Sequence, residues 1–451
     1  MAIKIKNLTI GFITLFLTAV FLVLLMAYSV NGLEAVTEQR ISDCQQRVEA
    51  YQADLEKSTD ADEIKSLNSK IETYESRMND LQNKNRWYVL GMGILLMFIV
   101  GVMVYSQFFK AAITTPVAAV SLLLGIGISY QYIFSVDKTM VLSLALCLVF
   151  GIAAYLVWRR INSVGDVFFY SLIALVAILF VLNIVFGVER NGSYNWVKVG
   201  PVSIQPSEFV KVLLVLIGAL AYKNKVRSIV YAVTALTSCI VLLILRDLGA
   251  AAIIFAVFVF MAYWLMDIRI SLVCILVATV AVFCAAMALP YVGERFSNVG
   301  MAMLDGGPAQ QTKVLQSIIF GGIWGLGFDK STYMVNDFSV TSDTALAGIF
   351  AIYGLFMIIL VMAAYAVITA LPVFNHAIYP SSNYIICQAS ILLVVQVTLN
   401  FLGSIDVLPF TGVVAPFISD GGSALVSFGI LMGLVMAALN PSVKKYRRVA
   451  L

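Results

Sequence analysis

The sequence predicts an all-α polytopic membrane protein with about twelve transmembrane helices, and three observations support this fold class. Of the 451 residues, 61% are hydrophobic and 12% are charged, with a mean hydropathy of +0.95, which a soluble fold could not accommodate. Twelve apolar runs approach the length of about 20 residues that one membrane span needs. Basic residues also gather beside alternate ends of these runs.

The twelve runs are long and do not alternate between apolar and polar residues, so they favour helices over the strands of a barrel. The first run follows Lys4 and Lys6 as a signal peptide would. Its apolar part is too long and no small-residue cleavage site follows it, so we predict a retained anchor. The runs cover residues 8–30, 87–107, 112–132, 139–158, 166–186, 208–224, 227–245, 248–266, 270–288, 346–371, 382–402 and 421–440.

The distribution of basic residues predicts the orientation of the chain. If the twelve runs alternate, thirteen lysines and arginines fall on one side of the membrane, which the positive-inside rule identifies as cytoplasmic. Both termini are then cytoplasmic, and the segment 31–86 and the loops 187–207 and 289–345 face outward. The thirteen residues are Lys4, Lys6, Lys110, Arg159, Arg160, Lys223, Lys225, Arg227, Arg269, Lys444, Lys445, Arg447 and Arg448.

The segment 31–86 has a helical repeat of its own. Its apolar residues alternate in steps of three and four from Ile64 to Leu81, which is typical of a coiled coil. We predict an antiparallel helical hairpin whose arms continue the first two spans and rise roughly 35 Å at 1.5 Å per residue. The chain would then consist of a two-helix membrane anchor, 1–110, and a membrane core, 111–451. Partner docking, oligomerisation and a self-contained spacer all remain open as roles for the hairpin.

The outward loop 187–207 leads into a helix that carries two ionisable residues. Pro206 suits the first position of a helix, because the amide that proline lacks would be unpaired there. Glu208 and Lys211 then share one helix face near the membrane surface. Charges at such depth usually pair and often serve a site, although a purely structural ion pair is the alternative.

The stretch 289–345 is the longest polar, glycine-rich interruption in the later chain. It contains Arg295, Asp305 and a glycine cluster from Gly321 to Gly327. Loops on a rigid scaffold commonly carry function, so this stretch is the first candidate for chemistry. A solvated connector, with Arg295 paired to Glu294 or Asp305, is the structural alternative.

A second interrupted segment lies between the last two runs. Prolines, glycines and the carboxylates of Asp406 and Asp420 occur between Asn400 and Ser423. Irregular backbone at membrane depth is tolerated only where protein buries it or where it lines a cavity. The segment therefore indicates a site or a gate.

With these stretches together, the sequence resembles the SEDS family (shape, elongation, division and sporulation), which includes RodA and FtsW. The resemblance covers ten spans from about residue 112 to the end and lies in five motifs, of which the second and the last are the most specific in combination. The matching residues are Asn191, Gly192 and Trp196; Gln205, Pro206, Ser207, Glu208 and Lys211; Asp247, Leu248 and Gly249; Gly321, Gly322, Ile323, Gly325 and Gly327; and Leu408, Pro409, Thr411, Gly412, Pro416, Phe417, Ser419, Gly421, Gly422 and Ser423.

The resemblance implies a peptidoglycan glycosyltransferase that polymerises lipid II during elongation, division or sporulation. By count from Arg295, the acidic residue essential in the family falls on Asp305, which would act as the base for the acceptor hydroxyl. Cationic side chains would hold the departing pyrophosphate, and glycines would allow a close backbone approach. The expected substrate-binding residues are Arg190, Lys198, Glu208, Lys211, Arg295, Gly321, Gly322, Ser419, Asp420, Gly421 and Gly422.

The resemblance also implies a location and partners. We expect a multi-pass protein of the bacterial cytoplasmic membrane whose partners are lipid II and a class B penicillin-binding protein, a transpeptidase, and not a nucleic acid. No cofactor is evident, because no cluster of His and Cys has metal-ligand spacing.

Three departures from the family pattern keep two other functions open. Asn195 stands where the family has Arg, Asp420 where it has Tyr, and Ala351 and Ile352 where it has a Glu pair. Altered or lost activity would suit a non-catalytic scaffold that recruits cell-wall proteins. Broken helices with buried charges also occur in transporters, so a flippase for the lipid-linked precursor is the other alternative, although no repeated halves are evident.

Overall fold

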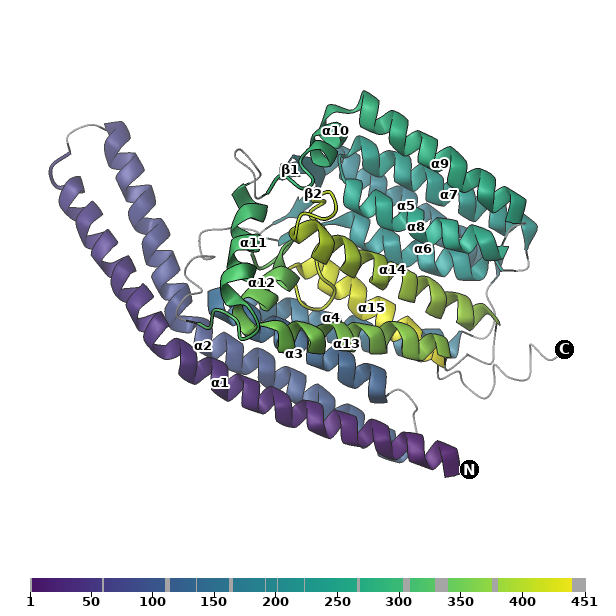
Figure 1. Cartoon of the computed structure of the whole chain (residues 1–451), viewed down its shortest axis with the longest axis horizontal. Helices are drawn as coiled ribbons and strands as arrows, with labels where there is room; N and C mark the ends of the chain where they lie inside the picture. Colours follow the sequence, from purple (N-terminus) through teal and green to yellow (C-terminus); the bar gives the residue numbers. More distant parts are fainter. Residues whose placement is uncertain are drawn as a thin grey trace.

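The computed structural model describes residues 2–58, 61–109, 114–134, 136–161, 165–190, 192–200, 202–222, 224–265, 268–302, 309–328, 340–374 and 380–439. These residues form a bundle of helices from which one long hairpin projects (Figure 1). The predicted all-α membrane fold is confirmed. The helices are α1 (Ala2–Leu55), α2 (Ala61–Phe109), α3 (Thr114–Phe134), α4 (Lys138–Arg160), α5 (Asp166–Phe186), α6 (Pro206–Leu220), α7 (Lys225–Ile244), α8 (Leu248–Leu265), α9 (Ile268–Ala288), α10 (Pro290–Ser297), α11 (Ala309–Gly321), α12 (Ala345–Tyr353), α13 (Leu355–Phe374), α14 (Pro380–Ser404) and α15 (Gly422–Leu439).

Every predicted run contains a helix, although the helices differ in length. Among the described residues, nine helices are long and apolar enough to cross a membrane. The α6 helix has only 15 residues and α8 is a shorter apolar helix, so the number of twelve spans stays a prediction. The start of α1 and the end of α15 lie at the same end of the bundle (Figure 1).

The predicted hairpin is confirmed as two continuous helices, α1 of 54 residues and α2 of 49 residues. Each runs from the projecting arm into the bundle without a break (Figure 1). At the base of the hairpin, the Tyr88 hydroxyl lies 2.9 Å from Ser129 Oγ, and Arg40 Nη1 donates to the Ile133 carbonyl at 2.6 Å. Lys84 is fully buried over the ring of Tyr132. The two N-terminal helices are therefore packed against α3, while the division at residue 110 stays a prediction.

Helices α4 and α15 cross at backbone distance. A Cβ atom added at Gly433 would lie 2.1 Å from the Gly151 carbonyl oxygen, and one at Gly429 would lie 2.4 Å from the Cys147 carbonyl oxygen. Small residues permit such close approach of membrane helices. This contact holds the last helix of the bundle against the second helix of the core.

Replacing Gly433 with leucine should separate α4 from α15 and destabilise the protein by on the order of 1–3 kcal/mol or more, because the neighbouring atoms belong to backbone. Thermal unfolding of the purified protein in detergent measures the loss. Gly93→Leu is the control, since no atom lies within 4 Å of a Cβ at that position. Equal unfolding temperatures for the two variants would contradict the close crossing.

The loop 187–207 contains an antiparallel sheet that was not expected from its sequence. Its strands are β1 (Gly187–Arg190), β2 (Ser193–Val199) and β3 (Val202–Ile204), in the order β1-β2-β3. Val188 pairs with Trp196, and Val197 pairs with Ile204. Gly192 and Gly200 have φ values of 76° and 62°, which glycine adopts without steric cost and which suit tight hairpin turns.

The run predicted at 346–371 is divided into α12 and α13 at Gly354, where φ is 80°. The glycine cluster 321–327 causes this break by lying against it, backbone to backbone. Leu326 N donates to the Ala351 carbonyl at 2.8 Å, and Leu355 N donates to the Ile323 carbonyl at 2.9 Å. The prediction of one uninterrupted span here is therefore wrong, and α13 alone has the length of a span.

Candidate functional site

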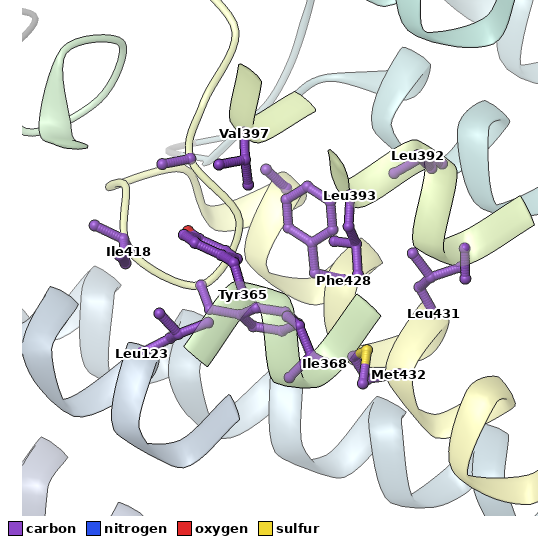
Figure 2. Packing of buried hydrophobic residues seen from close by; sticks show 14 of the residues in the cluster. Leu123, Tyr365, Ile368, Leu392, Leu393, Val397, Ile418, Phe428, Leu431 and Met432 are labelled. Carbon is purple, nitrogen blue, oxygen red and sulfur yellow. The ribbon is translucent and has the colours of Figure 1, made fainter. Parts of the chain in front are cut away.

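The second half of the interrupted segment between Asn400 and Ser423 is largely buried by protein from Val413 to Ser419, whereas Val407, Gly412 and Asp420 are exposed. Its backbone carbonyls accept hydrogen bonds from three helices: Gln131 Nε2 donates to Ile418 at 2.7 Å, Asn400 Nδ2 to Val413 at 2.7 Å, and Tyr365 Oη to Pro416 at 2.6 Å. Figure 2 shows Tyr365 and Ile418 with Phe428 in the apolar packing around this segment. The segment is therefore held rigidly in the bundle.

The ends of several elements meet at Asp247, which lies between α7 and α8 and is buried. Its Oδ2 atom accepts hydrogen bonds from Asn195 Nδ2 at 2.7 Å, Ser207 Oγ at 3.2 Å and Gln205 Nε2 at 3.3 Å. Its Oδ1 atom accepts from Ala250 N at 3.0 Å and so caps α8. These donors join β2, the start of α6 and the start of α8 around one carboxylate.

Arg295 lies on α10 beside this carboxylate. Burial lowers the pKa of the Arg295 guanidinium, while the charges of Asp247, Tyr291 and Asp343 act in the opposite direction. The group remains protonated, because the pKa of arginine is far above neutral. Arg295 Nη1 is buried and has no hydrogen-bond partner among the described residues. Within the described part of the chain this donor is unused, and a guanidinium donor of this kind can bind an anionic group.

Glu208 and Lys211 form an ion pair in the first turns of α6, just after Ser207, which donates to Asp247. Lys211 Nζ lies 2.8 Å from each carboxylate oxygen of Glu208, and the two side chains are only 5% and 2% exposed. The same Nζ donates to Gln396 Oε1 at 2.9 Å, and Gln396 Nε2 donates to the Val414 carbonyl at 3.1 Å. The ion pair is thus connected to the interrupted segment through Gln396.

Four predicted residues line one small cavity between α3, α4 and α15. They are Ser419, Asp420, Gly421 and Gly422, and Gln131 and Ser143 lie across from them. Ser423, the residue after Gly422, connects this cavity to the residues around Asp247. Its Oγ accepts a hydrogen bond from the backbone N of Gln205 at 3.2 Å, and the Gln205 side chain donates to Asp247. The cavity and Asp247 therefore lie on either side of the start of α15.

The other predicted residues do not line this cavity, and one of them is outside the described residues. Asp305 belongs to residues 303–308, which lie outside the described residues. The backbone of Arg190 belongs to β1, and Lys198 is an exposed residue of β2. Gly321 ends α11 and Gly322 follows it, and a Cβ at Gly321 would clash with the Ala351 carbonyl oxygen. This glycine permits close packing of protein backbone.

Asp247, Asp343 and Asn195 are not among the site residues that the sequence predicts. The sequence identifies Asp247 only as part of a hinge motif between two helices. The charge of Asp343 raises the pKa of Arg295. The backbone carbonyl of Asp343 accepts a hydrogen bond from Asn400 Nδ2 at 2.8 Å. A buried polar residue in a hinge between two apolar runs is the signal that could have identified Asp247.

Comparison with known proteins matches residues 112–443 to the FtsW/RodA/SpoVE family, described as cell cycle protein. The chain is 26% identical over 293 residues to a probable peptidoglycan glycosyltransferase FtsW of Bacillus subtilis, covering 58% of this chain and 72% of that protein. It is 29% identical over 290 residues to the protein of the same name from Synechocystis, covering 60% and 72% of the two chains.

Solved structures share the fold. A chain from a structure entitled "Structural coordination of polymerization and crosslinking by a peptidoglycan synthase complex" superposes with a TM-score of 0.56 at 22% identity, covering 72% of this chain and 96% of that one. Thermus thermophilus RodA, a rod shape determining protein, gives a TM-score of 0.50 at 20% identity, covering 72% and 95% of the two chains. The family match at residues 112–443 leaves the whole of α1 and α2 outside. This integral membrane protein belongs to the FtsW/RodA/SpoVE family.

Proposed function

We propose that the protein is a peptidoglycan glycosyltransferase that polymerises lipid II into glycan strands. Family membership and relatives that carry this activity in their names support the proposal. The observation that carries it is Arg295, whose buried Nη1 has no hydrogen-bond partner among the described residues and whose guanidinium is influenced by the charges of Asp247 and Asp343. The pyrophosphate of a lipid-linked sugar lies at the membrane surface, at the same end of the bundle as Arg295.

The reaction needs a base and a site for the leaving group. Asp305 takes the proton of the acceptor hydroxyl as that oxygen bonds to the anomeric carbon of the donor sugar. The bond from that carbon to the pyrophosphate oxygen breaks, and polyprenyl pyrophosphate leaves. Arg295 stabilises the charge that develops on the pyrophosphate, because guanidinium donors match phosphate oxygens in geometry. Arg190 and Lys198 on the neighbouring sheet are the further cations for this group.

The proposal includes the orientation of the chain in the membrane and its protein partner. Both termini are cytoplasmic, which agrees with the common end of α1 and α15 in Figure 1 and with the basic residues predicted on that side. The partner is a class B penicillin-binding protein, because a structure of the same fold is described as a synthase complex that coordinates polymerisation with crosslinking.

Incubating the purified protein with radiolabelled lipid II, with and without a co-purified transpeptidase, tests the proposal. We expect labelled glycan polymer, resolved by gel electrophoresis and removed by a muramidase. Translocation of lipid II across proteoliposomes without polymer would instead favour a flippase. Neither activity, together with retained capture of the transpeptidase, would favour a scaffold.

A further inference from the structure

An apolar cavity of about 450 Å³ lies between α2, α3, α4 and α15, away from the outward site. Its walls include Phe98 and Val102 of α2, Val117 of α3, and Met432 and Met436 of α15. Family membership covers residues 112–443, so the wall formed by α2 is an addition to the family core. The close crossing of α4 and α15 at Gly151, Gly429 and Gly433 forms another part of the lining.

The cavity opens sideways between α2 and α4. The lining residues Gly101 of α2 and Ile152 and Leu156 of α4 are exposed, whereas those from α15 are buried. The exposed faces of two membrane-spanning helices contact lipid tails in a bilayer. An apolar chain can therefore enter this cavity from the membrane without crossing polar surface.

Arg159 lies at the rim nearest the termini. Its Nη1 donates to the hydroxyls of Tyr155 at 2.9 Å and Tyr105 at 3.0 Å, and both tyrosines line the cavity. Its Nε is buried and has no hydrogen-bond partner among the residues that the structure describes. In the part of the chain that the structure describes, no carboxylate forms an ion pair with Arg159. A buried, unused guanidinium donor beside an apolar cavity fits an anionic headgroup whose tails fill the cavity.

We propose that this cavity binds an anionic glycerophospholipid from the leaflet on the side of the termini. Its acyl chains lie between α2 and α4, and its phosphate accepts from Arg159. The bound lipid fills the gap between α2 and the core and so fixes the projecting hairpin to the membrane core. This role is separate from polymerisation at the outward end.

Native mass spectrometry can test the proposal, using the full chain released from nanodiscs with equal amounts of phosphatidylglycerol and phosphatidylcholine of matched tails. We expect retained phosphatidylglycerol, preferred about fivefold or more over phosphatidylcholine. Arg159→Gln should bring the ratio close to one, while the matched variant Arg160→Gln, at the exposed neighbouring position, keeps the preference. An unchanged ratio in Arg159→Gln would overturn the assignment of the headgroup.

A second pair of variants tests the cavity itself. Gly101→Leu places a side chain in the opening, where no atom lies within 4 Å of a Cβ, and should abolish retention of both lipids. Gly93→Leu adds the same side chain to α2 away from the cavity lining and should retain lipid as the parent does. Equal retention by the two variants would overturn the proposal. Displacement of phosphatidylglycerol by polyprenyl pyrophosphate at equal mole fraction would also overturn it, in favour of a substrate tail.

Discussion

Replacing Asp305 with asparagine is expected to lower the rate of lipid II polymerisation by about 10²–10⁴, because a placed carboxylate contributes that much as a general base. Asparagine keeps the size of the side chain but cannot take the proton of the acceptor hydroxyl. The rate of polymer formation at saturating lipid II measures the effect. Affinity for lipid II should change little, since the base acts in the transition state and the cations hold the pyrophosphate.

The matched control for this variant is Glu294→Gln, which neutralises an exposed carboxylate on α10 in the same stretch, 289–345. We expect this variant to polymerise at the parent rate. Thermal unfolding of both proteins shows whether either change affects the fold. If Asp305→Asn polymerised at the rate of Glu294→Gln, Asp305 would not be the base, although the family membership would stand.

Much of the fold could be predicted because lipid imposes simple rules on sequence. Long apolar runs must form helices in a bilayer. The heptad spacing from Ile64 to Leu81 also predicts helices in the polar segment 31–86, beyond the apolar runs. The sheet β1-β2-β3 was missed because its strands are only four, seven and three residues long. The break at Gly354 depends on contact with the backbone of residues 321–327, which is distant in the sequence. Periodicity within one run cannot reveal such a contact.

The candidate site was less predictable, for the same reason. Glu208 and Lys211 are three residues apart on one helix, so their pairing follows from spacing. The donors to Asp247 come from β2 and α6, up to 52 residues away, and their meeting depends on how the helices pack. For Arg295 the sequence offers only Glu294 and Asp305 as structural partners, whereas the charges acting on it include those of Asp247 and Asp343.

Removing one partner of the Glu208–Lys211 pair should destabilise the protein by about 3–5 kcal/mol, because an unpaired charge is then left buried in the bundle. We expect this loss for Lys211→Met, in which the methionine fills the space of the lysine stem. Unfolding monitored by calorimetry in detergent gives the difference from the parent. A Lys211→Met protein as stable as the parent would show that the interior there is hydrated and that the pair adds little.

The double variant Glu208→Leu/Lys211→Met separates the structural role of the pair from a functional one. Since it leaves no buried charge, most of the lost stability should return, and the coupling between the two sites should be of similar size to the single loss. Gln396 keeps its bond to the Val414 carbonyl in this variant, but Lys211 no longer holds it. If the pair only stabilises the bundle, the double variant polymerises lipid II at close to the parent rate. We expect instead a stable protein with reduced polymerisation, because the side chain that positions the interrupted segment has lost its charged anchor.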